Sequence, residues 1–131
     1  MQNSLIRRER RATRRVLRSE LRRRSAANRL ASSCHRRPRS LATVAIAAGV
    51  DKDTASGCAN GLRTVAKRLG VTPAATARTR RTVAGGRAHR THTVSRYSLG
   101  QVCTLVRAYK PRKPAYVAAI ALIAAFAGGA R

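Results

Sequence analysis

Apolar residues recur at helical spacing along the start of the chain. Between Leu5 and Ser33 there is neither proline nor glycine, and a thin apolar stripe recurs at steps of mostly three to five residues. This pattern predicts one helix over residues 5–33, because residues three to four apart share a helix face. Such a helix would be roughly 43 Å long, longer than a small domain is wide, so we expect an arm. The stripe consists of Leu5, Ile6, Ala12, Val16, Leu17, Leu21, Ala26, Ala27 and Leu30.

After a basic hinge at Pro38, shorter apolar segments follow. Residues 41–48 are apolar almost all round and predict a buried helix, and residues 54–69 predict a second, with Asp51 or Asp53 as its N-cap. Gly57 and Gly61 lie on this second helix. Because glycine lowers helix propensity, we expect another helix or a phosphate backbone to approach closely there.

The rest of the chain predicts three further elements. A helix is expected from Thr72-Pro73 to Gly85-Gly86, followed by a loop or short extended piece over residues 87–97. Ser98 with Gln101 has capping-box spacing and opens a helix that runs to Tyr109. Pro114 opens a last helix, 115–127, which carries no charge.

These elements predict an all-α protein. A long Arg-rich N-terminal helical arm, residues 1–40, is followed by a small bundle of short Ala/Val/Leu-rich helices, residues 41–131, which is expected to mediate subunit packing. Aromatic residues make up 3% of the chain and there is no Trp, which favours closely approaching helices over a sheet sandwich.

The net charge of the chain predicts a negatively charged partner. The chain has 29 Lys and Arg against four acids, a net charge of +25, and residues 1–40 alone hold fourteen arginines and two acids. Guanidinium stays protonated at any biological pH, so we expect the phosphates of a nucleic acid to be bound. The expected contacts are Arg7, Arg8, Arg10, Arg11, Arg14, Arg15, Arg18, Arg22, Arg23, Arg24, Arg29, Arg36, Arg37, Arg39, Arg63, Lys67, Arg78, Arg80 and Arg81.

The uncharged last helix predicts a contact between subunits. It is shorter than the roughly 20 residues that cross a bilayer, so it is not expected to be transmembrane. A short helix that is apolar on every side needs more burial than one small domain provides, so we expect Tyr116, Ile120, Ile123 and Phe126 to lie at a subunit interface. Contact with a lipid envelope is the less favoured alternative.

No grouping of residues indicates catalysis, so the protein is not expected to be an enzyme or to hold a cofactor. Cys34, Cys58 and Cys103 are too far apart to form a metal-ligand pair and are expected to be small buried residues. His89 and His92 lack a neighbouring Cys, Asp or Glu, which favours contacts to phosphate or water over a metal site.

One motif, Val44-Ala45-x-x-Ala48-Gly49-Val50-x-x-x-Thr54-Ala55-Ser56, resembles the helix-turn-helix of bacterial repressors. The resemblance implies a sequence-specific regulator in which residues 54–60 enter a major groove. That segment offers Thr54, Ser56 and Asn60, but no Arg, Lys or Gln for base edges.

A second resemblance covers more of the chain. The basic N-terminal helix, the hinge, Gly49-Val50, the segment 61–67 (GLRTVAK), Val102-x-x-Leu105-x-x-Ala108-Tyr109 and the apolar last helix are similar to the major coat proteins of filamentous double-stranded-DNA viruses of hyperthermophilic archaea, the rod-shaped and lipid-enveloped groups. This chain is richer in arginine and poorer in aromatics than that pattern.

The coat-protein resemblance implies a structural virion protein that wraps double-stranded DNA without sequence preference and holds it in the A-form. It also implies homo- or heterodimeric coat subunits in a helical filament, assembled in the host cytoplasm. This is the first functional hypothesis. The helix-turn-helix regulator is the second, and an Arg-rich RNA-binding or ribosomal-type protein is the third.

Overall fold

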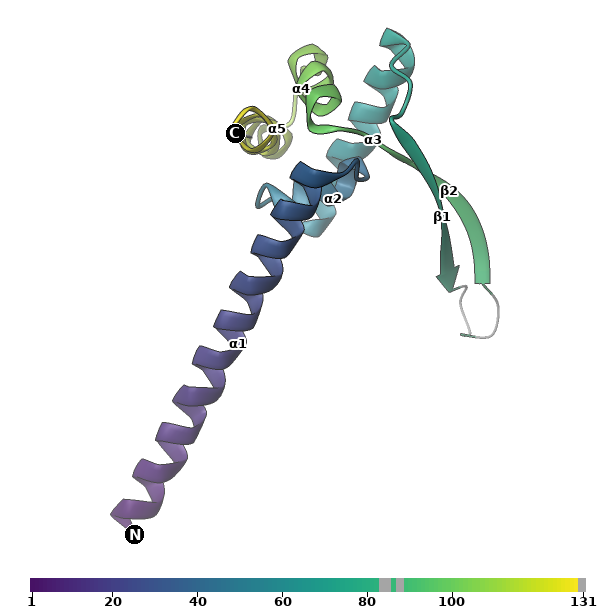
Figure 1. The fold of residues 1–131 in the computed structure, drawn as a ribbon. Helices are drawn as coiled ribbons and strands as arrows, with labels where there is room; N and C mark the ends of the chain where they lie inside the picture. Colours follow the sequence, from purple (N-terminus) through teal and green to yellow (C-terminus); the bar gives the residue numbers. More distant parts are fainter. Residues whose placement is uncertain (83–85, 87–88, 130–131) are drawn as a thin grey trace.

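The computed structural model describes residues 1–82, 86 and 89–129 of the chain (Figure 1). The described part is mostly helical, with five helices and one two-stranded antiparallel hairpin. In chain order the elements are α1 (Gln2–Arg36), α2 (Leu41–Ala47), α3 (Lys52–Leu69), β1 (Ala75–Thr82), β2 (His89–Arg96), α4 (Leu99–Ala108) and α5 (Pro114–Gly128).

The expected arm is a single straight helix that projects from the body (Figure 1). α1 has 35 residues, six more than the 29 expected, and residues 1–29 are exposed throughout. Its last turns pack on the body, where Cys34 is 3% exposed. At 1.5 Å per residue the helix is about 52 Å long.

The expectation of an all-α fold was wrong in one segment. Residues 75–82 were predicted to be helical, but they form β1 and pair with β2 in an antiparallel register from Ala75 opposite Arg96 to Thr82 opposite His89. Part of the predicted turn after this segment, 83–85, lies outside the described residues. Ala and Arg favour a helix, but threonines recur in both strands, and β-branched residues favour the extended conformation of a strand.

The other predicted helices are confirmed within a few residues at each end. α3 begins at Lys52, two residues before the expected start, with Asp51 as its cap. The predicted capping box is present, since Ser98 Oγ accepts from the Gln101 N–H at 3.3 Å and Gln101 Oε1 accepts from the Ser98 N–H at 3.1 Å. The N-terminal end of α4 is therefore fixed by its own first turn.

The core lies where α2, α3, α4 and α5 meet, and it is built from small and medium apolar side chains. The largest fully buried ones are Leu41, Val44, Cys58, Leu62, Val102, Leu105 and Ile123. Cys34 and Cys58 are buried, as expected, while Cys103 is only partly buried. Within the described residues no polar or charged side chain is buried, so every described basic group reaches the surface.

The two glycines of α3 are covered by tyrosines. A Cβ placed on Gly57 would collide with the phenol of Tyr116 in α5, and one placed on Gly61 would collide with the ring of Tyr109, which caps α4. Another helix or a phosphate backbone was expected to approach closely at these glycines. The neighbour is instead an aromatic ring in each case, and it joins α3 to the C-terminal part of the chain.

We expect Gly61→Ala to destabilise the protein by about 1–2 kcal/mol. The methyl group displaces the Tyr109 ring, and this loss of packing outweighs the roughly 1 kcal/mol that alanine adds in helix propensity. In a Tyr109→Ala background the same change should stabilise instead, because the obstruction is gone. Thermal or urea unfolding of the four proteins measures this coupling.

Gly100→Ala provides the control for that cycle, because the added Cβ would meet only Ser98 Oγ, at 4.0 Å. Its effect should be the same in both Tyr109 backgrounds. Equal effects of Gly61→Ala in both backgrounds would contradict the packing described for Tyr109.

Candidate nucleic-acid interface

α2 and α3 are consecutive helices, and local interactions fix the turn between them. Gly49 has φ +100°, a left-handed conformation that glycine adopts without strain. Val50 follows it and is 7% exposed, so the turn is held against the core. Asp51 Oδ2 then accepts from the Thr54 N–H at 3.1 Å, which caps α3.

Each of the two helices buries very small side chains. Ala45 of α2 and Ala55 of α3 are both 0% exposed, and Cys58 is buried one turn further along α3. Small buried residues allow neighbouring helices to pack closely. The outer side of α3 is turned to solvent.

One polar line runs along this outer side of α3. Its members follow at steps of four, four, three and four residues, which places them on one helix face. They are Lys52, Ser56, Asn60, Arg63 and Lys67, and all are exposed. Arg63 Nη1 donates to Asn60 Oδ1 at 2.7 Å. The line therefore presents several hydrogen-bond donors, and two of its side chains, Asn60 and Arg63, are hydrogen-bonded to each other.

The sequence interpretation identified only part of this line. Arg63 and Lys67 were expected to bind nucleic acid, and the helix-turn-helix motif covered Ser56 and Asn60. Lys52 was missed because the helix was expected to start at Thr54, which is half-buried in the structure. Recognising Asp51 as the cap would have placed Lys52 in the first turn.

The β-hairpin adds a second basic element. Arg78 and Arg80 lie on one face of β1, opposite Thr93 and Thr91, and both are exposed. Arg90 lies on the other face and is also exposed, but it was missed because residues 87–97 were expected to form a loop or short extended piece. Arg81 belongs to β1, and its side chain lies outside the described part of the chain.

The two histidines expected to contact phosphate or water both lie on β2. His92 stands opposite Thr79, whose Oγ1 is 3.2 Å from its Nε2. The side chain of His89 lies outside the described part of the chain. His92 is therefore engaged in a cross-strand contact, and its ring stays exposed on the hairpin.

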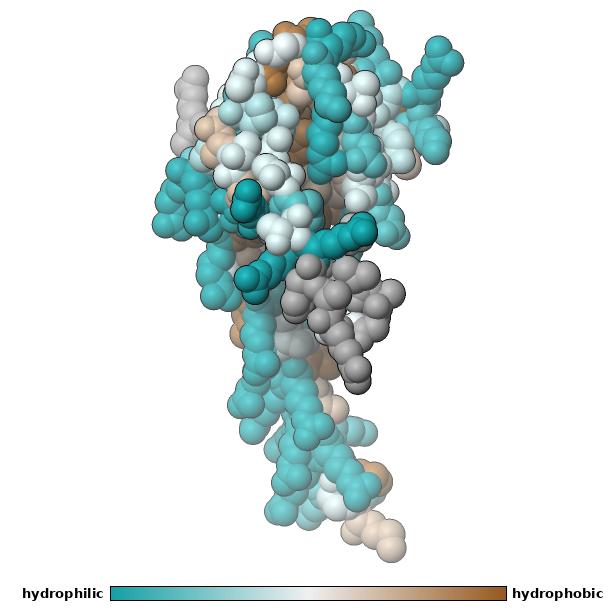
Figure 2. All heavy atoms as spheres, turned by 90° about the vertical axis from the view of Figure 1, so that its right-hand side faces the viewer, coloured by the Kyte–Doolittle hydropathy of each residue, from teal (hydrophilic) through white to brown (hydrophobic). Residues whose placement is uncertain are grey.

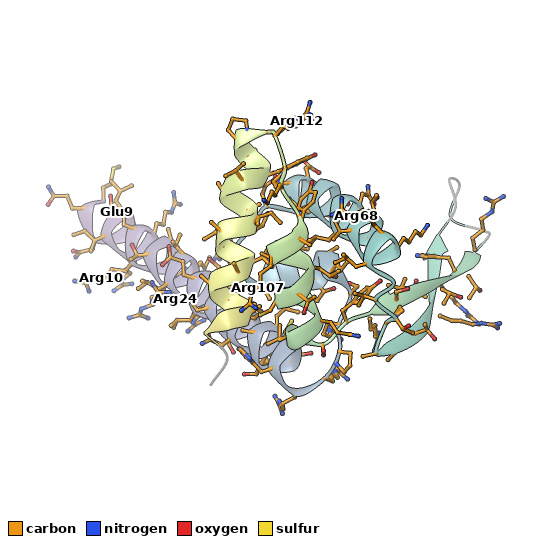
Figure 3. All side chains as sticks on the ribbon, turned by 90° about the horizontal axis from the view of Figure 1, so that it is seen from above. Glu9, Arg10, Arg24, Arg68, Arg107 and Arg112 are labelled. Atoms are coloured by element: carbon orange, nitrogen blue, oxygen red, sulfur yellow. The ribbon has the colours of Figure 1, made fainter. Side chains whose placement is uncertain are left out.

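The arm supplies a third basic element, and its arginines favour one face. Arg7, Arg11, Arg14, Arg18, Arg22 and Arg29 follow at steps of three, four or seven residues, which places them on one line along α1. Arg8, Arg10, Arg15, Arg23 and Arg24 lie beside that line or behind it. Figure 3 shows Arg10 and Arg24 directed away from the body. Near the body, Arg36 and Arg37 are exposed and Arg39 is half-buried.

The arm and the hairpin are joined at their bases. Arg39, just after α1, pairs with Tyr97, just after β2: the Arg39 N–H donates to the Tyr97 carbonyl at 3.1 Å, and the Tyr97 N–H donates to the Arg39 carbonyl at 2.9 Å. Both basic projections leave the body toward its lower side in Figure 1, while α4 and α5 lie nearest the viewer in the view from above (Figure 3). Figure 2 shows hydrophilic residues along the arm and over much of the hairpin side of the body.

The four residues expected at a subunit interface lie largely inside the chain's own fold. Ile123 is 1% exposed, and the Phe126 ring packs on His35 of α1 with ring centroids 5.2 Å apart. Tyr116 covers Gly57, and Ile120 is half-buried against the core. The exposed large apolar residues of α5 are instead Val117 and Leu122. Because α5 is apolar all round, sequence periodicity could not distinguish its two faces.

We also examined the described part of the chain for clusters of metal-binding residues and for helices that could span a membrane. Among residues 1–82, 86 and 89–129, no cluster of three or more His, Cys, Asp or Glu is placed to hold a metal ion. Within the same ranges, no helix is both long enough and apolar enough to cross a membrane.

Comparisons with protein-family models, with curated proteins and with solved structures gave no match to this chain.

We expect the cap of α3 to titrate at low pH. Hydrogen bonds from Thr54, through its side chain and its backbone N–H, lower the pKa of Asp51 below the usual aspartate range. A carboxylate with a lowered pKa contributes stability above its unfolded pKa and loses that contribution as the pH falls through its folded pKa. The Thr54 amide resonance in NMR should therefore shift as the sample is acidified through and below the usual aspartate range.

Asp51→Asn is the matched control, because asparagine also caps helices but does not titrate. Its Thr54 resonance should shift less over the same acidification, because the carboxylate that accepts from the Thr54 N–H is gone. A shift of equal size in the Asn variant would show that the titrating group is not Asp51.

Proposed function

We propose that this protein binds double-stranded DNA by placing α3 in the major groove, while the arm and the hairpin hold the phosphate backbone. The observation that carries the proposal is the exposed polar line on α3, which would be the second helix of a helix-turn-helix unit formed by α2 and α3. A major groove admits one α-helix, and helix-turn-helix proteins read it with the second helix of the unit.

The residues of the line have the chemistry that base reading requires. Lysine and arginine donate to the acceptor edge of guanine, asparagine pairs with adenine, and serine serves either role. The hydrogen bond between Arg63 and Asn60 orients both side chains before DNA arrives, and the Asn60 amide N–H groups remain available as donors. Pre-orientation reduces the side-chain entropy lost on binding.

The residues on the exposed face of α3 favour a sequence-reading protein, which was the second hypothesis from the sequence, over a coat protein, which was the first. The segment 54–60 lacked Arg, Lys and Gln, which counted against a sequence-specific regulator. Because the exposed face runs from Lys52 to Lys67, three basic residues join Ser56 and Asn60 on it. A sequence-reading DNA-binding protein is therefore our first candidate.

In this proposal the arm and the hairpin bind the phosphate backbone and do not read the bases. Their arginines lie on long exposed elements, and bidentate guanidinium contacts to phosphate position a protein without reading sequence. A net charge of +25 would neutralise on the order of 25 phosphates, or about a dozen base pairs. Such a footprint exceeds what the helix-turn-helix unit alone would cover.

A second candidate is the packaging coat protein of a filamentous virus, with homo- or heterodimeric subunits around the duplex. One observation favours it: residues 2–29 of α1 are all exposed, as a helix laid along DNA would require. In that case the arm would dominate binding and α3 would add no sequence preference. A folded RNA is the third candidate partner, and it is included as a ligand in the same test.

Selection from a random pool of duplexes, followed by binding measurements at fixed salt, tests the first candidate. We expect a consensus site bound at least about a thousandfold more tightly than random duplex. Asn60→Ala should reduce that preference by about 1–3 kcal/mol, because the alanine side chain cannot hydrogen-bond to a base edge. Asn28→Ala removes an exposed asparagine from the arm and should leave the preference unchanged.

Two other outcomes of these measurements would favour the coat protein or the RNA-binding protein. Equal binding to every duplex with filaments of constant width in electron microscopy would favour the coat protein. Tighter binding to folded RNA than to any duplex would favour the RNA-binding hypothesis. Either result would contradict major-groove reading by α3.

Removing residues 1–27 should weaken binding to every duplex and flatten its salt dependence. This segment is exposed along its whole length and holds ten arginines, so the body should stay folded without it. The slope of log K against log salt should fall by about 0.9 for each phosphate that the shortened chain no longer neutralises. Circular dichroism and the Asn60-dependent preference for the consensus site report whether the body is still folded. An unchanged slope of log K against log salt would show that the arm does not contact the DNA.

A further inference from the structure

The arm carries an apolar face that no described element covers. Leu5 is 56% exposed and Val16 is 55% exposed, and Ala12 and Ala27 are exposed on the same side of α1. Figure 1 shows α1 projecting from the body with no other element alongside its outer part. The same side of the helix carries Cys34, which is buried in the body. The side by which α1 packs on its own core is therefore left uncovered over most of its length.

The charges of the arm are divided between its two sides. The line of arginines described above lies on the side of α1 opposite the apolar face. Both acids of the arm, Glu9 and Glu20, lie within the apolar face, and Arg23 is the one arginine of α1 that lies between them and Ala27 on that face. A nucleic acid would be attracted to the arginine line and repelled by the two carboxylates. The apolar face is therefore suited to a different partner.

Glu9 has no cation at the positions where a helical neighbour would pair with it. The residues three and four positions away on either side are all uncharged, although the chain holds 29 Lys and Arg. Its carboxylate is exposed within an apolar face. A helix that covers this face and brings a cation to Glu9 would therefore complement it in charge, and Arg23 offers such a cation on the same face of a second copy.

The spacing of this face is symmetrical about Val16. From Val16 the face continues after four, three and four residues in each direction. We call these seven residues the seam: Leu5, Glu9, Ala12, Val16, Glu20, Arg23 and Ala27. Because its steps are the same in both directions, the seam matches itself when a second helix runs the opposite way.

A two-fold axis through Val16 brings complementary residues of the two seams together. Leu5 of one copy then lies level with Ala27 of the other, so a large residue meets a small one. Glu9 lies level with Arg23, so an acid meets a base, and this pair occurs twice in each dimer. Both copies gain the same contacts, as an isologous interface requires.

The length of the exposed part of the arm fits the same register. α1 is exposed from Gln2 to Arg29, and Leu30 is the first residue that is half-buried. In an antiparallel pair centred on Val16, Gln2 of one copy lies level with Leu30 of the other. Each arm is then covered over its exposed length, and the two bodies lie at opposite ends of the pair.

We propose that the arm is a dimerisation helix, in which the seam of α1 pairs antiparallel with the seam of a second copy of this chain. The arginine lines of both helices stay on the outside of the pair, and α3 and the hairpin take no part in it. This inference does not rest on DNA binding, and it is tested without DNA.

The charge of the two copies gives the dimer a distinctive salt dependence. Two chains of +25 repel each other, and at about 1 M salt charges are screened beyond about 3 Å, while the apolar contact is retained. Dimerisation should therefore strengthen as salt increases from low concentration. Binding to a phosphate backbone has the opposite dependence.

Analytical ultracentrifugation of the full chain, freed of nucleic acid, tests the proposal over a range of protein and salt concentrations. We expect the mass to rise from 14.2 kDa to twice that value and no further. Val16→Lys should raise the dimer dissociation constant by about a hundredfold, because two ammonium groups would meet in the apolar centre of the pair. Leu21→Lys is the matched control, since Leu21 is 63% exposed but lies beside the arginine line, and it should dimerise like the wild type.

Reversing the charges tests the contact between Glu9 and Arg23. At moderate salt Glu9→Arg should raise the dimer dissociation constant by about tenfold, because two attractive pairs in each dimer become repulsive. Adding Arg23→Glu to that variant should restore dimerisation, since the two charges are exchanged. Circular dichroism of each variant reports whether α1 remains helical.

Cysteine crosslinking measures the register and direction of the pair. The two copies of residue 16 face each other across the axis, so Val16→Cys should form a crosslinked dimer under mild oxidation. Leu5→Cys should not, because its two copies would lie roughly 33 Å apart along the pair, well beyond the ~7 Å between Cα atoms that a disulfide spans. Non-reducing gel electrophoresis of both variants, compared with the wild type and its native cysteines, gives the result.

Five results would overturn the proposal. The first is a wild-type chain that stays at 14.2 kDa at every concentration and salt, and the second is normal dimerisation of Val16→Lys. The third is equal dissociation constants for Glu9→Arg and the charge-exchanged variant. The fourth is crosslinking of Leu5→Cys as readily as Val16→Cys, which would indicate a parallel pair. The fifth is a monomer that binds phosphatidylcholine vesicles through Val16, which would assign this face to lipid.

Discussion

Repulsion between like charges is the constraint on which this structure depends. A chain with 29 basic residues and four acids cannot neutralise itself, and the described residues bury no charged group. The fold responds by separating its two kinds of residue. Alanine, valine, leucine and cysteine form a compact core, and arginine is concentrated on a long helix and a hairpin that project from it. Such elements keep cationic groups apart and in water until a polyanion is present.

Two of the four acids lie at the start of α3, where a carboxylate interacts with the backbone of the helix. Asp51 caps α3 and Asp53 lies in its first turn, where the positive end of the helix dipole favours a carboxylate. α3 then connects several parts of the body: its inner side is buried in the core, Tyr116 and Tyr109 cover its two glycines, and its outer side is polar. A single helix thus sets both the packing of the core and the orientation of the proposed reading face.

Local signals in the sequence predicted most of the helices and few of their tertiary roles. The arm followed from a run without proline or glycine, and α4 followed from the spacing of Ser98 and Gln101. The hairpin was missed because residues 75–82 contain Ala and Arg, good helix formers, and the partner strand lies in residues 87–97, which were expected to form a loop or short extended piece. The outward face of α5 was missed for another reason: a helix of uniform polarity carries no pattern that distinguishes inside from outside, and only the tertiary contacts of Ile123 do so. For the candidate interface, the residue types were predictable, but their alignment on one face of α3 required the start of that helix to be known.

The pairing of Arg39 with Tyr97 has a mechanical consequence. These two backbone hydrogen bonds join the chain just beyond the arm to the chain just beyond the hairpin, although the two residues are far apart in sequence. A torque applied to the 35-residue α1 acts on a long lever, and the short connection at its base passes that torque to the hairpin without an intervening loop. The pairing therefore couples the direction of the arm to the direction of the hairpin.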